Sequence, residues 1–260
     1  IHIVSALHPV RPFSYYEGVV RQVRAALPRA DIKAFTPVEV VNFAKTEGTS
    51  VRDILRTLQA AGLSSLPGGG AEILSDRVRA IICPNKATRV EWLGCMRTAH
   101  ELGIRTNASM MYGHIETVEE RIDHLLALRD LQDETGGFQA FMLFPFHPEN
   151  TALGAEKKLM RVGSWEDMKM LALARLVLDN VAHFKAFWVM LTQPIAQLAL
   201  GFGADDLDGT IGEEKIIHAA GAQTQTGITR RELDAMIREA GYVPVERDTF
   251  YQPIAAGEGA

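Results

Sequence analysis

The fold class of this chain is decided by the stretch Phe138-Gln139-Ala140-Phe141-Met142-Leu143-Phe144-Pro145-Phe146. Its centre, Phe141 to Phe144, is apolar throughout and does not alternate with polar residues, which is typical of a strand covered on both faces. Such strands build parallel sheets, whose faces are covered by helices or by other strands. We therefore predict an α/β fold with a parallel sheet.

Strand-like segments recur along the chain and alternate with helix-like segments, as in a series of βα units. The other predicted strands are Ile1–Leu7, Ile32–Thr36, Leu66–Gly69, Arg105–Tyr112, Lys185–Leu191 and a short one at Gly203–Leu207. Seven strands within 260 residues approach the eight strands and roughly 250 residues of a (β/α)8 barrel. Because the chain opens in mid-strand, we expect a TIM-type barrel whose first strand and following loop lie upstream. Residues 1–254 are expected to form this single domain, and residues 255–260 a frayed tail.

A Ser or Thr followed three residues later by an acidic residue marks the start of several predicted helices. Such pairs occur at Ser50/Asp53, Thr88/Glu91, Thr117/Glu120, Ser164/Asp167 and Thr229/Glu232. The pairs with Glu fit the capping box, and those with Asp a looser version of it. Gln193-Pro194 begins a further helix, because proline is favoured in a first helical turn.

The composition excludes several classes of protein. Hydrophobic residues make up 47% of the chain and charged residues 23%, as in a globular protein with a large core. The net charge of −5 gives no basic surface for nucleic acid or membrane. No apolar run reaches the roughly 18 residues of a membrane span, and the strand-like start is no signal sequence. We expect a cytoplasmic protein in which Cys83 and Cys95 are buried bystanders, because their spacing matches no metal motif.

The active site of such a barrel lies at the carboxyl ends of its strands. Pro67-Gly68-Gly69-Gly70-Ala71-Glu72 is the sharpest feature there, because three glycines let a ligand approach the backbone closely. Glu72 could then accept hydrogen bonds from ribose hydroxyls or from an ammonium group. The alternative interpretation is a flexible turn followed by a solvated glutamate.

Other polar residues also follow predicted strands. His8, His114 and His147 have no pair at i, i+2 or i, i+4 spacing, so the sequence offers no local metal chelate. As a set they are better interpreted as substrate or cofactor contacts. The acidic run Asp205-Asp206-Leu207-Asp208 either points to the mouth of the barrel or forms a solvated loop before the next helix.

Taken in order, these segments resemble the radical S-adenosylmethionine (SAM) enzymes of the futalosine route to menaquinone. The segments that carry the resemblance are Leu7-His8-Pro9, Pro67–Glu72, Cys83-Pro84-Asn85-Lys86, Thr106-Asn107-Ala108, Tyr112–Thr117, Gln132–Phe138, Phe146–Thr151 and Ala204–Thr210. Phe146-His147-Pro148 favours the aminofutalosine synthases, since the sister dehypoxanthine futalosine cyclases usually have Gln in place of His. The acidic run with Gly209-Thr210 favours the synthases as well.

This resemblance implies a [4Fe–4S] cluster on a Cys-x3-Cys-x2-Cys loop, SAM as a co-substrate, and an electron donor such as flavodoxin or ferredoxin. In the synthases a 5′-deoxyadenosyl radical adds to 3-[(1-carboxyvinyl)oxy]benzoate, an aromatic enol ether, and gives aminofutalosine and bicarbonate. Three thiolates must reach one cluster, and this chain has two cysteines. We therefore expect the cluster ligands upstream of Ile1, no metal ligands within the chain, and no activity from residues 1–260 alone.

The resemblance also implies roles for individual residues. Ser5 and Ala6, where the family often has glycine, would approach the methionyl end of SAM, and Gly69, Gly70 and Glu72 would line the SAM side. The residues expected to face the substrate are Asn107, His114, His147 and Asp206. The candidates for a proton transfer are His147, Asp206 and Asp208.

Two other classes of function remain open from the residues alone. A metal-dependent hydrolase on the same barrel would use His8, His114, His147 and an aspartate as ligands of zinc or manganese. A barrel without a cluster would be a binding module that holds nucleosides without turnover.

Overall fold

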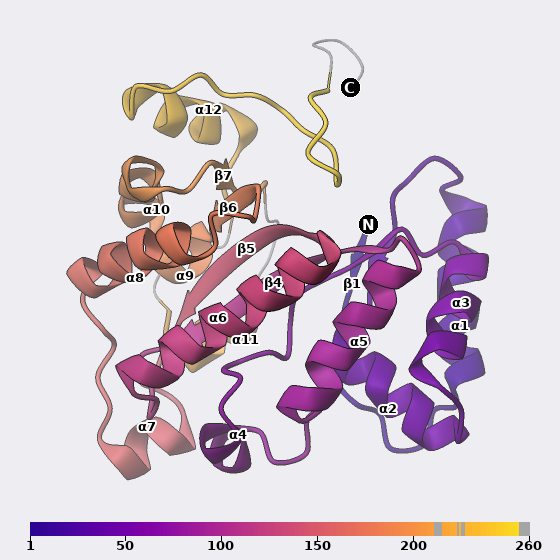
Figure 1. Ribbon diagram of the computed structural model, residues 1–260. Helices are drawn as coiled ribbons and strands as arrows, with labels where there is room; N and C mark the ends of the chain where they lie inside the picture. Colours follow the sequence, from indigo (N-terminus) through magenta and orange to yellow (C-terminus); the bar gives the residue numbers. More distant parts are fainter. Residues whose placement is uncertain (211–214, 223, 225–226, 255–260) are drawn as a thin grey trace. The chain divides into compact units, whose positions relative to one another are not determined.

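The computed structural model describes residues 1–210, 215–222, 224 and 227–254 (Figure 1). Within these ranges, seven strands form one sheet and follow one another in their order along the chain. The strands are β1 (His2–Ile3), β2 (Lys33–Ala34), β3 (Ser65–Leu66), β4 (Arg105–Tyr112), β5 (Phe138–Pro145), β6 (His183–Ala186) and β7 (Asp206–Leu207). The pairs β1–β2, β2–β3, β3–β4 and β6–β7 are parallel. This confirms the predicted α/β class with a parallel sheet of the βα type.

Helices separate the strands, as expected for βα units. In the first half of the chain these are α1 (Phe13–Ala26), α2 (Pro37–Glu47), α3 (Val51–Ala61), α4 (Asp76–Ile82), α5 (Arg89–Glu101) and α6 (Val118–Thr135). In the second half they are α7 (Ala152–Lys157), α8 (Ser164–Val177), α9 (Trp188–Leu191), α10 (Gln193–Ala199), the 3₁₀ helix η1 (Leu200–Phe202), α11 (Ile216–Ala220) and α12 (Arg230–Glu239). No helix in the described ranges combines the length and the apolar character that crossing a membrane requires.

The predicted strands agree with the structure at the centre of the chain and less well elsewhere. β4 has the predicted bounds, and β5 ends one residue before the predicted end. The predicted strand 185–191 is wrong beyond Ala186, because Trp188–Leu191 forms the short helix α9. An apolar run of this length does not distinguish a buried strand from a buried helix. The frayed tail predicted at 255–260 lies outside the described residues.

Most of the predicted helix starts are confirmed. Thr88, Thr117 and Thr229 each form a capping box with the glutamate three residues later, and Pro194 lies in the first turn of α10. The start at Ser164 is wrong by one position. Gly163 accepts hydrogen bonds from the backbone N–H groups of residues 166 and 167, so Ser164 is already helical.

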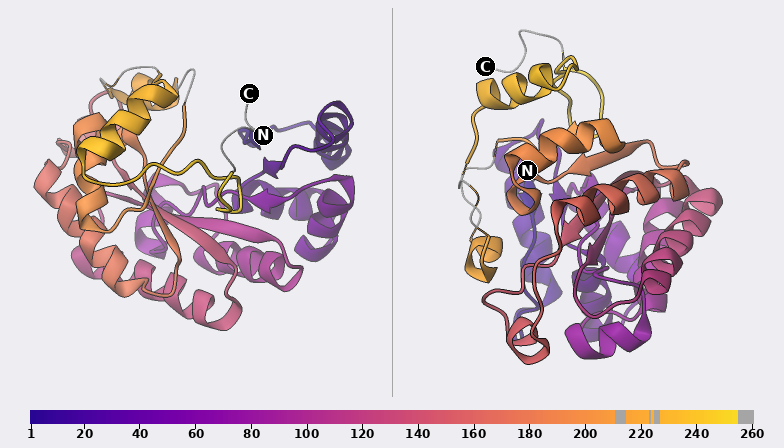
Figure 2. Two further views of the ribbon diagram at one scale, coloured as in Figure 1. Left: turned by 90° about the horizontal axis from the view of Figure 1, so that it is seen from above. Right: turned by 90° about the vertical axis from the view of Figure 1, so that its left-hand side faces the viewer.

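The chain divides into two compact units. The first consists of Ile1–Met111, Ile115–Phe141 and Leu178–Ala182. In its core the Trp92 and Phe138 rings stack with centroids 6.4 Å apart, and a cluster of aromatic rings joins α1 to β2 and α2. Figure 2 shows α5 and α6 lying along one face of the strands of this unit. Burying these aromatic side chains contributes much of the stability of the unit.

The second unit consists of Tyr112–His114, Met142–Val177 and His183–Ala260. Its core contains a buried polar group as well as apolar side chains. The Tyr112 hydroxyl donates to the Asp167 carboxylate, which also accepts from the Arg161 guanidinium at 3.0 Å. Asp167 is 2% exposed, so this ion pair fixes the start of α8 within the unit.

Candidate functional site

Three glycines follow β3, and the structure leaves no room there for larger residues. A Cβ atom on Gly68 would lie 2.7 Å from the backbone oxygen of Asn107 on β4, and one on Gly69 would lie 2.9 Å from the Thr36 side chain. Gly70 has φ of 80°, which favours glycine. The glycines predicted to contact SAM are therefore closely packed against the protein itself at the carboxyl end of β3.

Replacing Gly68 tests this packing. We expect Gly68→Ala to destabilise the protein by about 1–3 kcal/mol, because the added methyl group meets the backbone of β4, which cannot move aside as a side chain can. Gly94→Ala in α5 is the matched control, since its Cβ would have nothing within 4 Å, and it should stabilise by about 0.5–1 kcal/mol. Urea unfolding of the two variants gives both values. Equal and small effects would contradict this close packing.

Glu39 joins the ends of β1 and β2. It is 2% exposed. Its Oε1 accepts from the backbone N–H and the hydroxyl of Ser5 at 3.0 and 2.9 Å, and its Oε2 accepts from the same two groups of Thr36 at 2.7 and 2.8 Å. Four hydrogen bonds saturate the carboxylate, so Glu39 positions Ser5 and does not contact a ligand. Ala6 follows and is exposed.

Two further predicted residues of the first unit already have partners. Glu72 has φ of 45°, which is uncommon outside glycine, and its carboxylate accepts from the Lys86 ammonium at 2.6 Å. Asn107 on β4 is buried, and its Oδ1 accepts from the side-chain amide of Gln139 on β5 at 3.2 Å. Glu72 therefore follows β3 as predicted, whereas Asn107 lies near the beginning of β4 and not at its carboxyl end, so its predicted place at a strand end is wrong.

In the second unit, His147 follows β5 and is oriented by one backbone contact. Its Nε2 lies 3.1 Å from the carbonyl oxygen of Met190, so Nε2–H donates and Nδ1 is the acceptor nitrogen. Burial lowers the pKa of His147 below its ordinary value, despite the opposing effect of this carbonyl. A neutral imidazole with an oriented Nδ1 can accept a hydrogen bond or a proton. Nearby, the ring of His114 packs edge-to-face on Phe146, with centroids 5.9 Å apart.

Asp206 and Asp208, at and just after β7, lie on either side of Lys185 on β6. The Lys185 ammonium contacts the Asp208 carboxylate directly and lies 3.7 Å from that of Asp206. The Lys185 side chain is 8% exposed, whereas that of Asp208 is 21% exposed. A ligand can therefore reach Asp208 more easily than the lysine behind it.

A turn near the end of the described chain completes this cluster. The backbone pairs Arg247 with Pro253 and brings Arg247 and Tyr251 to Asp206. Arg247 donates to the Asp206 carboxylate at 2.6 Å, and the Tyr251 hydroxyl donates to it at 3.2 Å. The Tyr251 ring also stacks on His183 of β6, with centroids 3.9 Å apart. Asp206 is thus occupied by protein partners.

The cysteines provide no metal site. Cys83 and Cys95 are both buried, and burial raises the pKa of Cys95 to about 12, which keeps its thiol protonated. Within the described part of the chain, no three His, Cys, Asp or Glu side chains are placed to hold a metal ion. The residues present do not fit a [4Fe–4S] cluster, so the expectation of cysteines upstream of Ile1 stays a prediction. The hydrolase alternative finds no support in these residues.

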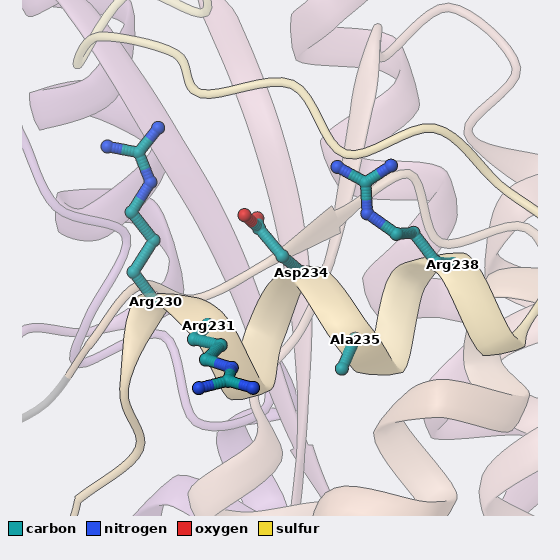
Figure 3. Close-up of a pocket in the computed structure, with 5 residues that line it drawn as sticks. All are labelled: Arg230, Arg231, Asp234, Ala235 and Arg238. Carbon is teal, nitrogen blue, oxygen red and sulfur yellow. The ribbon is translucent and has the colours of Figure 1, made fainter.

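A surface hollow elsewhere in the second unit lies along α12. Figure 3 shows the side chains of Arg230, Asp234 and Arg238 pointing to the same side of this helix, while Arg231 points away. Arg230 forms an ion pair with Glu246 at 2.9 Å, and both side chains are largely exposed. This hollow is lined by side chains of one helix, and none of the predicted site residues is among them.

Sequence reasoning missed four residues that hold the predicted ones in place: Lys185, Arg247, Tyr251 and Arg79, whose guanidinium donates to the carbonyl oxygens of Gly70 and Ala71. The capping box of Thr36 and Glu39 was missed as well, although it has the same spacing as the predicted ones. A lysine within an apolar strand was also a visible signal at position 185. The sequence around positions 247 and 251 gave no such signal, because their partner Asp206 lies more than 40 residues away in the chain.

Comparison with known proteins defines the class. The Radical SAM superfamily model matches residues 12–128, and the CofH/MqnC C-terminal region matches residues 135–258. HydG, a maturase of the [FeFe]-hydrogenase, superposes with a TM-score of 0.62 over 94% of this chain and 52% of its own, at 15% identity. Methylornithine synthase does so with a TM-score of 0.60 over 90% of this chain and 64% of its own, at 14% identity. The chain is therefore a radical SAM enzyme with the predicted TIM-type fold.

Sequence relatives then narrow the family. Aminodeoxyfutalosine synthase of Thermus thermophilus is 48% identical over 98% of this chain and 68% of its own length, and that of Streptomyces coelicolor is 44% identical over 100% and 69%. A 5-amino-6-(D-ribitylamino)uracil–L-tyrosine 4-hydroxyphenyl transferase of Methanosarcina acetivorans is 42% identical over 99% and 70%. The chain belongs to the aminodeoxyfutalosine synthase family of radical SAM enzymes, which confirms the predicted resemblance.

Proposed function

We propose that this chain is the main part of an enzyme that adds the 5′-deoxyadenosyl group of SAM to 3-[(1-carboxyvinyl)oxy]benzoate, giving aminofutalosine and bicarbonate for menaquinone biosynthesis. The observation that carries the proposal is identity of 44–48% to two aminodeoxyfutalosine synthases over nearly the whole chain. Phe146-His147-Pro148, the segment that favours the synthases, supports it.

The first unit offers a binding surface for SAM. Gly69 and Gly70 are partly exposed after β3, where the absence of side chains lets a ligand approach the backbone, and Glu39 holds Ser5 at the end of β1. Ser5, Ala6, Gly69, Gly70 and Glu72 would hold the methionyl part and the nucleoside. SAM, when bound and cleaved by one electron, supplies the 5′-deoxyadenosyl radical. The work of the protein is then to position the reactants and to exclude water.

The second unit supplies groups suited to the substrate. We assign His147 to a hydrogen bond with the substrate, because its Nδ1 is oriented and its imidazole is neutral. Asp208 suits a ribose hydroxyl better than Asp206, which Arg247 and Tyr251 already occupy. His114 and Asn107 remain candidates for contact with the substrate.

The enzyme also needs an electron source. Three thiolates bind the cluster of a radical SAM enzyme, and the two cysteines of this chain are buried. We propose that cysteines outside residues 1–260 hold the cluster and that a flavodoxin or ferredoxin reduces it.

The test is turnover by the full-length enzyme with a reconstituted cluster, SAM and a reductant. We expect aminofutalosine and methionine from 3-[(1-carboxyvinyl)oxy]benzoate. Cyclisation of dehypoxanthine futalosine, or transfer from tyrosine to 5-amino-6-(D-ribitylamino)uracil, in place of this reaction would overturn the assignment. His147→Gln should lower kcat about a hundredfold or more if the imidazole takes part in a proton transfer, and an unchanged kcat would remove His147 from that role.

A further inference from the structure

The short helix α9 of the second unit supplies the acceptor that orients His147. The last carbonyl groups of a helix have no partner within it and are satisfied by other groups. In α9 two side chains do this. His147 Nε2–H donates to the carbonyl oxygen of Met190 at 3.1 Å, and the Thr224 hydroxyl donates to that of Val189 at 2.9 Å. Because Val189 and Met190 are consecutive, Thr224 and His147 are bound to the same end of one helical turn.

Thr224 is itself oriented by a second histidine. Nε2 of His218 on α11 lies 2.9 Å from the carbonyl oxygen of Thr224, so this nitrogen carries a hydrogen and donates. The same Nε2 lies 3.2 Å from the Thr224 hydroxyl oxygen, which accepts from it while its own hydrogen points to Val189. The hydroxyl of Thr224 is therefore directed toward α9.

α11 is also bound to the loop that carries His147. The backbone N–H and the side-chain amide of Asn150 donate to the carbonyl oxygens of Ala220 and Ala219, each at 3.1 Å. Gly221 follows α11 and packs closely on this loop, since a Cβ atom there would lie 2.7 Å from Cβ of Glu149. α11 and Thr224 are thus bound both to the loop of His147 and to the helix that holds its ring.

α9 is too short to fix its own carbonyl groups. It has four residues, and isolated helices shorter than about 12 residues are marginal in water. It ends at Thr192, whose φ of 82° is uncommon for a β-branched residue and is maintained only by surrounding contacts. The direction of the Met190 carbonyl therefore depends on what α9 contacts, and the Thr224 hydroxyl is a contact at the neighbouring carbonyl.

We propose that Thr224 is the positioning residue for His147. Through Val189 it holds α9 in the place where the Met190 carbonyl keeps a hydrogen on Nε2 of His147 and leaves Nδ1 as the acceptor for a ligand. Only the identity of that ligand rests on the proposed function, because the hydrogen bonds that carry the proposal lie within the protein.

The first measurement does not depend on turnover. Burial lowers the pKa of His147, so its ring is neutral at about pH 8. NMR of isotope-labelled histidine in the full-length enzyme distinguishes the two neutral tautomers, and the signal missing in His147→Gln identifies residue 147. We expect the Nε2–H tautomer in the wild type and in Thr224→Ser, which keeps the hydroxyl.

Thr224→Val keeps the shape of the side chain without its donor and should give a mixture of the two tautomers at His147. Thr224 is partly exposed, so the protein should still fold. An unchanged Nε2–H tautomer in Thr224→Val would overturn the proposal, whatever the effect of this substitution on activity.

Turnover of 3-[(1-carboxyvinyl)oxy]benzoate by the full-length enzyme then measures the consequence for catalysis. Thr224→Val should lower kcat about tenfold, as for a slightly misplaced catalytic group, and Thr224→Ser should stay within about twofold of the wild type. In the His147→Gln background, Thr224→Val should cause no further loss, because a residue that acts through His147 has nothing left to position. An equal loss in both backgrounds would show a general structural role and overturn the proposal.

Thr98→Val is the matched control. The Thr98 hydroxyl also donates to a backbone carbonyl, that of Gly94 at 2.8 Å, but this bond lies within α5. The substitution should change neither the tautomer of His147 nor kcat. A wild type that does not turn over the benzoate would contradict the proposed function instead, and the tautomer of His147 would still decide whether Thr224 positions it.

Discussion

Lowering the pH from 7.5 to 5 should reduce the free energy of unfolding by about 4 kcal/mol, through two histidines of the first unit, the buried His124 and the half-buried His100. Burial is the main cause that lowers the pKa of His124 to about 3 and that of His100 to about 4, and nearby arginines add to both shifts. The unfolded chain binds these protons near pH 6.5. The stability that comes from keeping these two histidines neutral is therefore complete above pH 6.5. It is lost as the pH falls from there toward their pKa values in the folded protein.

The hydrogen bonds explain why neither ring accepts a proton. His124 Nδ1 accepts from the backbone N–H of Leu74 at 3.0 Å, so a proton on Nδ1 would face another donor. His100 lies between Thr135 and Thr106, with contacts of 2.6 and 2.8 Å. Thr135 already donates to a backbone carbonyl, so it accepts from Nδ1–H, and Nε2 accepts from Thr106. His124 Nε2, which carries the proton of the neutral ring, is buried and has no hydrogen-bond partner among the described residues, so burial is the main cause of its low pKa. Below pH 6.5 each neutral histidine makes the free energy of unfolding fall by about 1.4 kcal/mol per pH unit.

Urea unfolding between pH 7.5 and 5 measures this loss before most carboxylates titrate. His124→Asn and His100→Asn should each remove about half of the pH dependence, because asparagine does not titrate. His8→Asn is the control, since His8 is exposed and its Nδ1 accepts from the nearby N–H of Val10. If both variants keep the full pH dependence, these two histidines are not its cause.

Local sequence signals predicted the framework better than the site. The apolar run at β5 and the threonine-glutamate pairs before α5, α6 and α12 depend on neighbouring residues, and the structure has them where the sequence indicated. The run Trp188–Leu191 was wrongly predicted as part of a strand, because a buried helix and a buried strand cannot be distinguished by composition over four residues.

The site residues depend on contacts across the chain. The sequence located Gly69, Glu72, His147 and Asp208 at strand ends, since the barrel rule needs only the order of the strands. It did not show that Arg79 would hold the glycine loop by its carbonyls. That arrangement follows from the turn of α4 back over residues 70–73, which no local pattern encodes.

Asp206→Asn should destabilise the protein by about 3 kcal/mol. The Asp206 side chain is 10% exposed and is the common acceptor for Arg247 and Tyr251, with the Lys185 ammonium 3.7 Å away. Burial raises the pKa of Tyr251, so its hydroxyl stays protonated and donates. Removing the charge leaves two cations with one partly exposed partner, Asp208, and breaking such a buried pair costs about 3–5 kcal/mol. Arg247 is a quarter exposed, which places the effect at the lower end.

The same substitution should release the turn at residues 246–254, because Asp206 is where its arginine and tyrosine are fixed to β7. Limited proteolysis then cuts this segment faster in Asp206→Asn than in the wild type, and urea unfolding gives the loss of stability. Arg230→Ala is the matched control on the same unit. Its ion pair with Glu246 is exposed and should be worth less than about 1 kcal/mol. A loss in Asp206→Asn no greater than in Arg230→Ala would show that the buried cluster does not hold the turn. In that event Arg247 and Tyr251 would not hold the Asp206 carboxylate in place. Asp206 would then be a candidate again, beside Asp208, for the carboxylate that contacts the substrate.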